Sequence, residues 1–136
     1  MHLDELLTGL AHHKGSDLYF TAESPPLYRI DGATVPAFDH VLEAGDVERV
    51  IREVLSAAEQ DEFDRTRELN VARMVTGVGR FRLNVFRQRG QVGLVARLIP
   101  IDFPNADALG LPASLRELIM QRRGLILVTG ATGSGK

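Results

Sequence analysis

Seven residues near Lys136 have the types and the spacing of a phosphate-binding loop. They run Gly130-Ala131-Thr132-Gly133-Ser134-Gly135-Lys136, which reads G-x-x-x-x-G-K and lacks only the following serine or threonine of the full motif. Glycines let the backbone turn successive N–H groups onto phosphate oxygens. Lys136 would reach the β- and γ-phosphates as a mobile positive charge. The motif predicts a nucleotide site in which Lys136 is a catalytic residue.

The residues that precede this loop predict the elements that would position it. Leu125-Ile126-Leu127-Val128 is an apolar run without charge, as expected of a buried parallel strand that leads into such a loop. A helix is predicted from about Ala113 to Arg122, because its apolar residues recur on one face and Gly124 follows. Two prolines and several polar residues indicate a linker at 100–108.

A second group with chemical potential is a set of arginines. From Arg80 to Arg97 there are five arginines and no acidic residue, whereas the stretch from Asp39 to Glu68 has a net charge of −6. Arginine suits phosphate because its planar fork donates two parallel, charge-assisted hydrogen bonds. A strand with Arg80 and Arg82 on one face could reach a phosphate across an interdomain cleft. The alternative is a solvated face paired with the acidic helices, where each exposed pair contributes only ~0–1 kcal/mol.

The hydrophobic pattern of residues 1–99 predicts one α+β domain. Apolar residues recur at helical spacing in three segments and alternate with polar residues in six, so we expect three helices and about six short, mostly antiparallel strands. The predicted helices are 3–14, 47–55 and 56–65, and the predicted strands are 16–21, 27–30, 33–36, 69–75, 80–85 and 92–98. Asp31-Gly32 predicts a tight hairpin turn between the second and third strands, and Ser56-Ala57-Ala58-Glu59 has the spacing of a capping box for the third helix.

Composition restricts the classes of function. The chain has 136 residues, 44% apolar and 25% charged, and no cysteine, which excludes disulfides and cysteine-ligated metals. No apolar run approaches the ~18 residues of a membrane span. The net charge of −2 predicts no general affinity for nucleic acid. The neighbouring His12 and His13 point about 100° apart on a helix and lack a third ligand, so we expect no metal site.

Several stretches resemble, in the same order, the N-terminal half of the type IV pilus retraction ATPases, the PilT/PilU family of secretion ATPases. The resemblance covers essentially the whole chain. Two details are more similar to the PilU branch: Ala131, and Gln88-Arg89 followed by Val92-Gly93-Leu94-Val95. The stretches that carry the resemblance are Gly15-Ser16-Asp17-Leu18, Pro25-Pro26 with Arg29-Ile30-Asp31-Gly32, Gly79 to Phe86, Arg97 to Pro100, Leu109-Gly110-Leu111-Pro112, and Arg123-Gly124-Leu125.

This resemblance implies a PAS-like N-terminal domain at 1–99, a linker at 100–108, and at 109–136 the start of a RecA-like ATPase domain. It implies ATP with Mg²⁺, whose ligands would lie beyond Lys136, and arginines of the last two strands, Arg82 and Arg97, that approach the nucleotide. It further implies a hexameric ring in the cytoplasm at the inner membrane. The expected partners there are a platform protein of the pilus base and a paralogous retraction ATPase, and no nucleic acid.

Other functions stay open from the residues themselves. The chain could come from another ATPase of the secretion superfamily, for type II secretion or pilus assembly. The arginine face could instead bind nucleic-acid phosphates, with Phe86 as a stacking aromatic, or the domain could be a PAS-like sensor. We also expect residues 1–136 alone to fold but not to bind or hydrolyse ATP usefully, because the helix that should follow Lys136 organises the loop.

Overall fold

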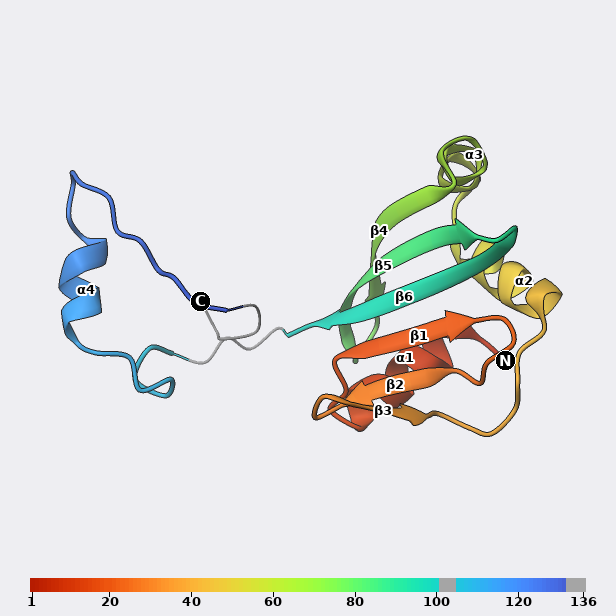
Figure 1. The fold of residues 1–136 in the computed structure, drawn as a ribbon, viewed down its shortest axis with the longest axis horizontal. Helices are drawn as coiled ribbons and strands as arrows, with labels where there is room; N and C mark the ends of the chain where they lie inside the picture. The colour runs from red at the N-terminus through yellow and green to blue at the C-terminus, as the bar shows by residue number, and fades with distance from the viewer. Residues whose placement is uncertain (101–104, 132–136) are drawn as a thin grey trace. The chain divides into compact units, whose positions relative to one another are not determined.

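The computed structural model describes residues 1–100 and 105–131 (Figure 1). Contacts between Cα atoms divide the chain into two compact units, Met1–Ile101 and Asp102–Lys136. The first unit carries nearly all of the regular structure and the whole of the buried core.

The first unit is a single antiparallel sheet with helices, which confirms the predicted α+β class. Its strands follow the order β3-β2-β1-β6-β5-β4, so the first and last strands of the unit are neighbours in the middle of the sheet (Figure 1). The elements are α1 (Leu3–His12), β1 (Asp17–Thr21), β2 (Leu27–Ile30), β3 (Ala33–Pro36), α2 (Ala44–Val54), α3 (Ala57–Thr66), β4 (Glu68–Val75), β5 (Gly79–Gln88) and β6 (Gln91–Ile99).

The core lies on one face of the sheet, because apolar residues alternate with polar ones along each central strand. One row across β1, β6 and β5 is Leu18, Ala96 and Leu83, and all three are buried. Helices α1 and α2 pack on this face, and α1 lies behind β1 and β2 in Figure 1. The helical residues that are buried are Leu3, Leu6, Leu7 and Leu10 of α1 and Val47, Val50 and Ile51 of α2. The opposite face of the sheet is covered by no helix of residues 1–100.

Two tight turns fix the register of the strand pairs. Arg89 and Gly90 connect β5 to β6 with φ angles of 52° and 83°, and Gln88 pairs with Gln91. Asp31 and Gly32 connect β2 to β3 in the same way, as the sequence predicted. Two-residue turns with positive φ at both positions match the twist of the flanking strands. The register of the β5–β6 pair decides which side chains of the open face are neighbours.

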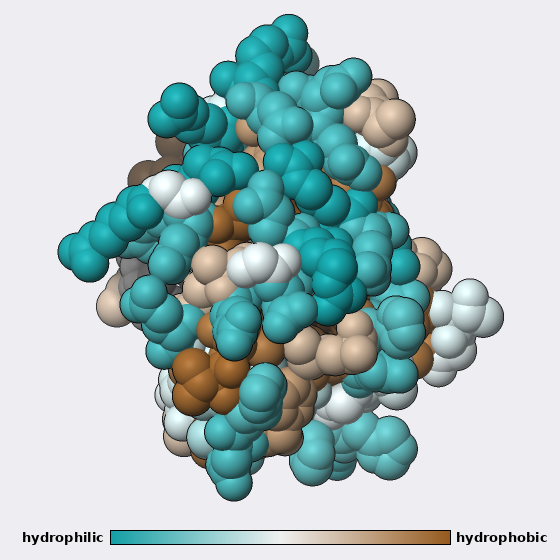
Figure 2. All heavy atoms as spheres, turned by 90° about the vertical axis from the view of Figure 1, so that its right-hand side faces the viewer, coloured by the Kyte–Doolittle hydropathy of each residue, from teal (hydrophilic) through white to brown (hydrophobic). Residues whose placement is uncertain are grey.

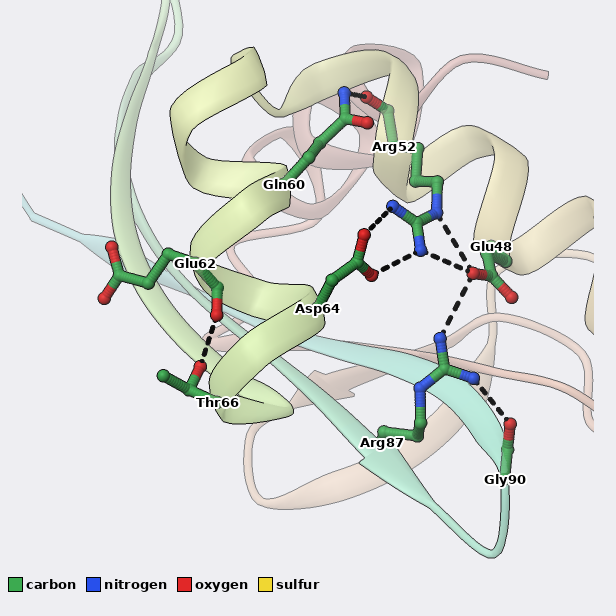
Figure 3. A network of polar contacts seen from close by, with 8 residues as sticks. All are labelled: Glu48, Arg52, Gln60, Glu62, Asp64, Thr66, Arg87 and Gly90. Atoms are coloured by element: carbon green, nitrogen blue, oxygen red, sulfur yellow. Dashed lines mark hydrogen bonds and ion pairs between the residues drawn. The ribbon is translucent and has the colours of Figure 1, made fainter.

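A polar network attaches α2 and α3 to the β5–β6 hairpin (Figure 3). The Arg52 guanidinium donates to both oxygens of Asp64 at 2.7 and 3.2 Å and to Glu48 at 3.0 Å. The Arg52 hydrogen bonds hold the pKa of the Asp64 carboxyl below its ordinary value. Arg87 donates to the same Glu48 oxygen at 3.2 Å and to the Gly90 carbonyl at 2.8 Å. The network therefore fixes the hairpin against both helices.

The surface near α2 is charged rather than apolar. Figure 2 shows the side of the molecule that lies to the right in Figure 1, where hydrophilic side chains predominate and apolar patches are small. On α2 itself, Arg49 forms ion pairs with Asp46 at 2.7 Å and Glu53 at 3.1 Å. In α3, the predicted capping box is present, since the backbone N–H of Ser56 and the side chain of Glu59 are 2.8 Å apart. The acidic stretch is thus largely a solvated helical surface.

The second unit differs from the sequence prediction. Its helix, α4 (Ser114–Ile119), is shorter than the predicted 113–122. Leu125–Val128, predicted as a buried strand, is not in a strand, and Leu125 is 81% exposed. A parallel strand is stable only with neighbouring strands and covering helices. The described part of this unit, residues 105–131, contains no strand beside which Leu125–Val128 could pair. In the described ranges, no helix is both long and apolar enough to span a membrane.

Candidate phosphate-contacting site

The open face of the sheet brings together the two arginines that the sequence singled out. Arg82 of β5 lies directly opposite Arg97 of β6, and Arg97 lies opposite Asp17 of β1. Arg29 of β2 continues the row on the far side of Asp17. The strand alternation explains this placement, because the neighbours of Arg82 in sequence, Phe81 and Leu83, point into the core.

Arg97 is anchored at one nitrogen and exposed at its end. Its Nε donates to Asp17 Oδ1 at 2.8 Å, and its side chain is 67% exposed, whereas that of Asp17 is 4% exposed. Ser16 Oγ donates to the second oxygen, Asp17 Oδ2, at 2.8 Å. The buried carboxylate thus has a partner at each oxygen. A buried charge of this kind is tolerated only when it is paired and hydrogen-bonded.

Arg82 is exposed and only weakly held. Its Nη2 lies 3.4 Å from Asn70 Oδ1, and no ion pair of Arg82 occurs among residues 1–100 and 105–131. Like charges that lie directly opposite each other across two strands destabilise a sheet. Arg82 and Arg97 are such a pair of like charges, and the Asp17 carboxylate offsets the charge of Arg97. Departures from the local rules of folding concentrate at functional sites.

These side chains line a groove of about 390 Å³ on the open face. The groove holds two arginines and two acidic residues, so its formal charge is balanced. Both acids already have donors, because Asn84 Nδ2 donates to Glu68 Oε1 at 3.2 Å. The exposed donors of the groove are therefore mainly the guanidinium ends. The lining residues are Asp17, Glu68, Asn70, Arg82, Asn84, Val95 and Arg97.

The other arginines of this stretch have different surroundings. Arg87 belongs to the network of Figure 3, and its guanidinium carbon also lies 5.9 Å from the centre of the Phe63 ring. It therefore stabilises the packing of α3 on the hairpin. Arg80 is exposed at the Gly79 end of β5, and Arg89 is in the turn at the opposite end. Neither has an ion pair in the described part of the chain.

The phosphate-binding loop lies mostly outside the described residues. Gly130 and Ala131 are described and are not in a helix or strand. Thr132, Gly133, Ser134, Gly135 and Lys136 are not described, so the geometry predicted for them stays a prediction. The two units are also not placed relative to each other, and the contact of Arg82 and Arg97 with a nucleotide stays a prediction as well. No cluster of three or more histidine and acidic side chains suited to a metal occurs in the described ranges.

Asp17 is the functional candidate that reasoning from the sequence missed. In the sequence, Asp17 is distinguished only as part of the stretch Gly15-Ser16-Asp17-Leu18. The sequence did contain a signal for the face on which Asp17 lies. Side chains alternate along a strand, so Asp17 lies on the same face as Tyr19, opposite to Leu18 and Phe20. What the sequence could not supply is the β1–β6 pairing that places this acid beside Arg97.

Comparisons with known proteins identify relatives over the whole chain. It is 35% identical over 136 residues to the type IV pilus ATPase PilU of Pseudomonas aeruginosa, and equally to the type IV pilus retraction ATPase PilT of that organism. The crystal structure of the pilus retraction motor PilT with bound ADP is similar over the full chain, with a TM-score of 0.85 and 36% identity. No family model matches the chain.

These likenesses establish homology and define its extent. The whole chain is homologous to the retraction ATPases, as the order of its motifs predicted, and its α+β fold is that of the PilT structure. The equal identities to PilU and PilT do not separate the two branches. The chain spans only 36% of PilU and 40% of PilT.

Proposed function

We propose that this chain is part of a longer ATP-hydrolysing motor that powers retraction of a type IV pilus. The observation that carries the proposal is the homology of all 136 residues to PilU and PilT, joined to a G-x-x-x-x-G-K sequence. A phosphate-binding loop has many uses, whereas the ordered set of motifs around it is specific. The domain boundaries that we propose are 1–99, 100–108 and 109–136.

The loop would hold the phosphates of ATP through the backbone N–H groups of residues 130–136, and Mg²⁺ would accompany the nucleotide. Lys136 would supply a positive charge where negative charge accumulates in phosphoryl transfer. Removal of such a charge usually costs several kcal/mol of transition-state stabilisation. Full-length protein with Lys136→Ala should therefore lose ATP hydrolysis while residues 1–99 stay folded. Turnover at the wild-type rate in that variant would refute the assignment.

Arg82 and Arg97 would extend the nucleotide site from the first unit. Two observations support a role of these arginines in nucleotide binding. Both side chains are exposed and line one groove, and the homologous PilT binds ADP. Arginines that stabilise transferring phosphates act on charge that develops in the transition state, so their loss lowers kcat more than it raises KM. In full-length protein we expect Arg82→Gln and Arg97→Gln each to lower kcat without unfolding the first unit. Arg82→Gln should leave the melting temperature nearly unchanged, whereas Arg97→Gln should lower it, because the buried Asp17 carboxylate loses its ion pair.

We infer the assembly and the location of the motor from the same homology. The full-length protein would form a hexameric ring in the cytoplasm at the inner membrane. It would act there on a platform protein of the pilus base, with a paralogous retraction ATPase as a further partner. Light scattering of the full-length protein with and without nucleotide tests the ring. A monomer in the presence of Mg-ATP would contradict it.

The 136 residues alone should not be an active enzyme. They span about two fifths of the length of PilU and PilT. Ordering the loop costs ~1–2 kcal/mol of conformational entropy per residue, and without the rest of its domain no packing offsets that cost. Calorimetric titration of the chain with Mg-ATP should show no micromolar binding. A micromolar dissociation constant would show that these residues already contain a complete nucleotide site.

A further inference from the structure

We propose that Asp17 is a positioning residue for Arg97, whose guanidinium it holds so that the terminal amino groups point away from the sheet and can meet a phosphate oxygen. The inference rests on the proposed function of Arg97. It adds a residue that touches neither nucleotide nor magnesium but sets the geometry of one that does.

The contrast in exposure between the two partners is the first observation. Arg97 is 67% exposed along its side chain, yet its anchor Asp17 is 4% exposed. An ordinary surface ion pair has two exposed partners, as Arg49 and Asp46 do at 57% and 47%. A buried carboxylate cannot follow the arginine as it moves, so it defines a fixed point from which the exposed guanidinium extends.

The atoms used in the bond are the second observation. A guanidinium has five N–H donors, one on Nε and four on the two terminal nitrogens. Asp17 accepts from Nε, and no hydrogen bond of either Nη atom of Arg97 occurs among residues 1–100 and 105–131. The terminal edge of the fork, which binds phosphate oxygens with two parallel hydrogen bonds, thus stays accessible.

A second arginine in this chain shows what a purely structural pair looks like. Arg73 donates to both oxygens of Asp4, from Nε at 2.7 Å and from Nη2 at 3.0 Å, and its Nη1 lies 3.4 Å from the Val54 carbonyl. All three nitrogens of Arg73 are engaged with neighbouring elements. The Arg97 pair uses one nitrogen, so its geometry suits a guanidinium that has a further partner.

The support for the carboxylate is also rigid. Ser16 Oγ donates a hydrogen bond to Asp17 Oδ2. The backbone of Ser16 is itself held by both neighbouring strands: its N–H donates to the Arg29 carbonyl at 2.8 Å, and its carbonyl accepts from the Leu98 N–H at 3.0 Å. The anchor thus sits at the centre of the sheet, between β2 and β6. Groups on rigid strands hold a site more precisely than groups on loops. Preorganisation of this kind reduces the entropy that a side chain loses when it meets its ligand.

The test is steady-state ATP hydrolysis by full-length protein that carries Asp17→Asn, with Asp4→Asn as the matched control. Asn keeps the shape of Asp but removes the charge that orients the guanidinium. Because small displacements of a catalytic group lower rates by up to about 10²-fold, we expect kcat to fall roughly tenfold or more in Asp17→Asn. KM should change little, and Asp4→Asn should hydrolyse ATP at the wild-type rate.

A double variant separates positioning from simple destabilisation. If Asp17 acts only through Arg97, Asp17→Asn should cause no further loss of kcat in an Arg97→Gln background, since coupled residues are not additive. Full additivity of the two losses would overturn the proposal. So would wild-type kcat in Asp17→Asn. Should that variant fold poorly, Ser16→Ala at an exposed position removes one hydrogen bond of the anchor and should lower kcat about twofold to tenfold. An unchanged kcat there would equally overturn it.

The outcomes also distinguish this inference from the function on which it rests. If Arg97→Gln slows hydrolysis and Asp17→Asn does not, the nucleotide role of Arg97 stands and the positioning role fails. If Arg97→Gln itself hydrolyses ATP at the wild-type rate, both fail together. If Lys136→Ala stays active, the phosphate-binding loop is misassigned, whatever the result at Asp17.

Discussion

Leu83 and Arg82 are neighbours on β5 that point to opposite faces of the sheet, and replacing each by alanine tests that arrangement. Leu83 is 1% exposed and lies between Ala96 of β6 and Val71 of β4. Arg82 is exposed beside Arg97. Leu83→Ala should therefore remove core packing, whereas Arg82→Ala removes a charge that faces a like charge.

The expected magnitudes differ by several fold. A buried Leu→Ala change costs about 2–5 kcal/mol, because the transfer free energy and the remaining cavity both count. For a unit of about 100 residues, each kcal/mol lowers the melting temperature by about 4–8 °C, so a fall of at least about 8 °C is expected. Arg82→Ala should stay within about 0.5 kcal/mol of the parent. Relief of the cross-strand repulsion would even raise its stability slightly.

Urea denaturation of the 136-residue chain, followed by far-ultraviolet circular dichroism, measures both free energies of unfolding. The predicted order is a large loss for Leu83→Ala and almost none for Arg82→Ala. Equal losses, or a larger loss for Arg82→Ala, would mean that the faces of β5 are assigned the wrong way round, and the open groove with its two arginines would have to be abandoned.

Three further predictions concern the packing that supports this sheet. Gly15→Ala would place a Cβ 2.5 Å from Leu10 Cδ1 and 3.0 Å from a backbone oxygen, so it should cost about 1–3 kcal/mol in the same denaturation assay. Tyr28→Phe removes the 2.8 Å hydrogen bond to the Leu6 carbonyl and should cost about 1 kcal/mol; an unchanged free energy of unfolding would contradict that bond. Asp64 has a lowered pKa in the folded chain, so its stabilising contribution is present above the ordinary aspartate pKa of about 4 and is lost as the pH falls below it. The melting temperature of Asp64→Asn should accordingly lie below that of the parent at pH 7 and approach it at pH 3.

Much of the first unit could be predicted because its signals are local. The alternation Arg80, Phe81, Arg82, Leu83 defines a strand and its two faces without knowledge of any partner. The turn signal at Asp31 and Gly32, and the capping box at Ser56, likewise depend on residues a few positions apart. All six predicted strands and all three predicted helices of this unit are present.

The remaining features depend on contacts that are distant in sequence. Asp17 meets Arg97 across 80 residues, and only the order of the strands brings them together. Leu125–Val128 failed as a predicted strand for the same reason, since an apolar run becomes a parallel strand only beside neighbours. Of the candidate site, the sequence could therefore indicate which arginines share a face but not the buried acid that anchors one of them.

We propose that the two arginines of the open groove act on a nucleotide held by the phosphate-binding loop. The most direct measurement is the kcat for ATP hydrolysis by full-length protein carrying Arg82→Gln or Arg97→Gln, with Arg89→Gln in the exposed β5–β6 turn as the control. Loss of a donor that stabilises transferring phosphate lowers kcat by about 10²-fold or more. We predict a loss of that order for Arg82→Gln and Arg97→Gln and none for Arg89→Gln. Wild-type kcat in both groove variants, in protein that stays folded at the assay temperature, would show that these arginines have no role in hydrolysis.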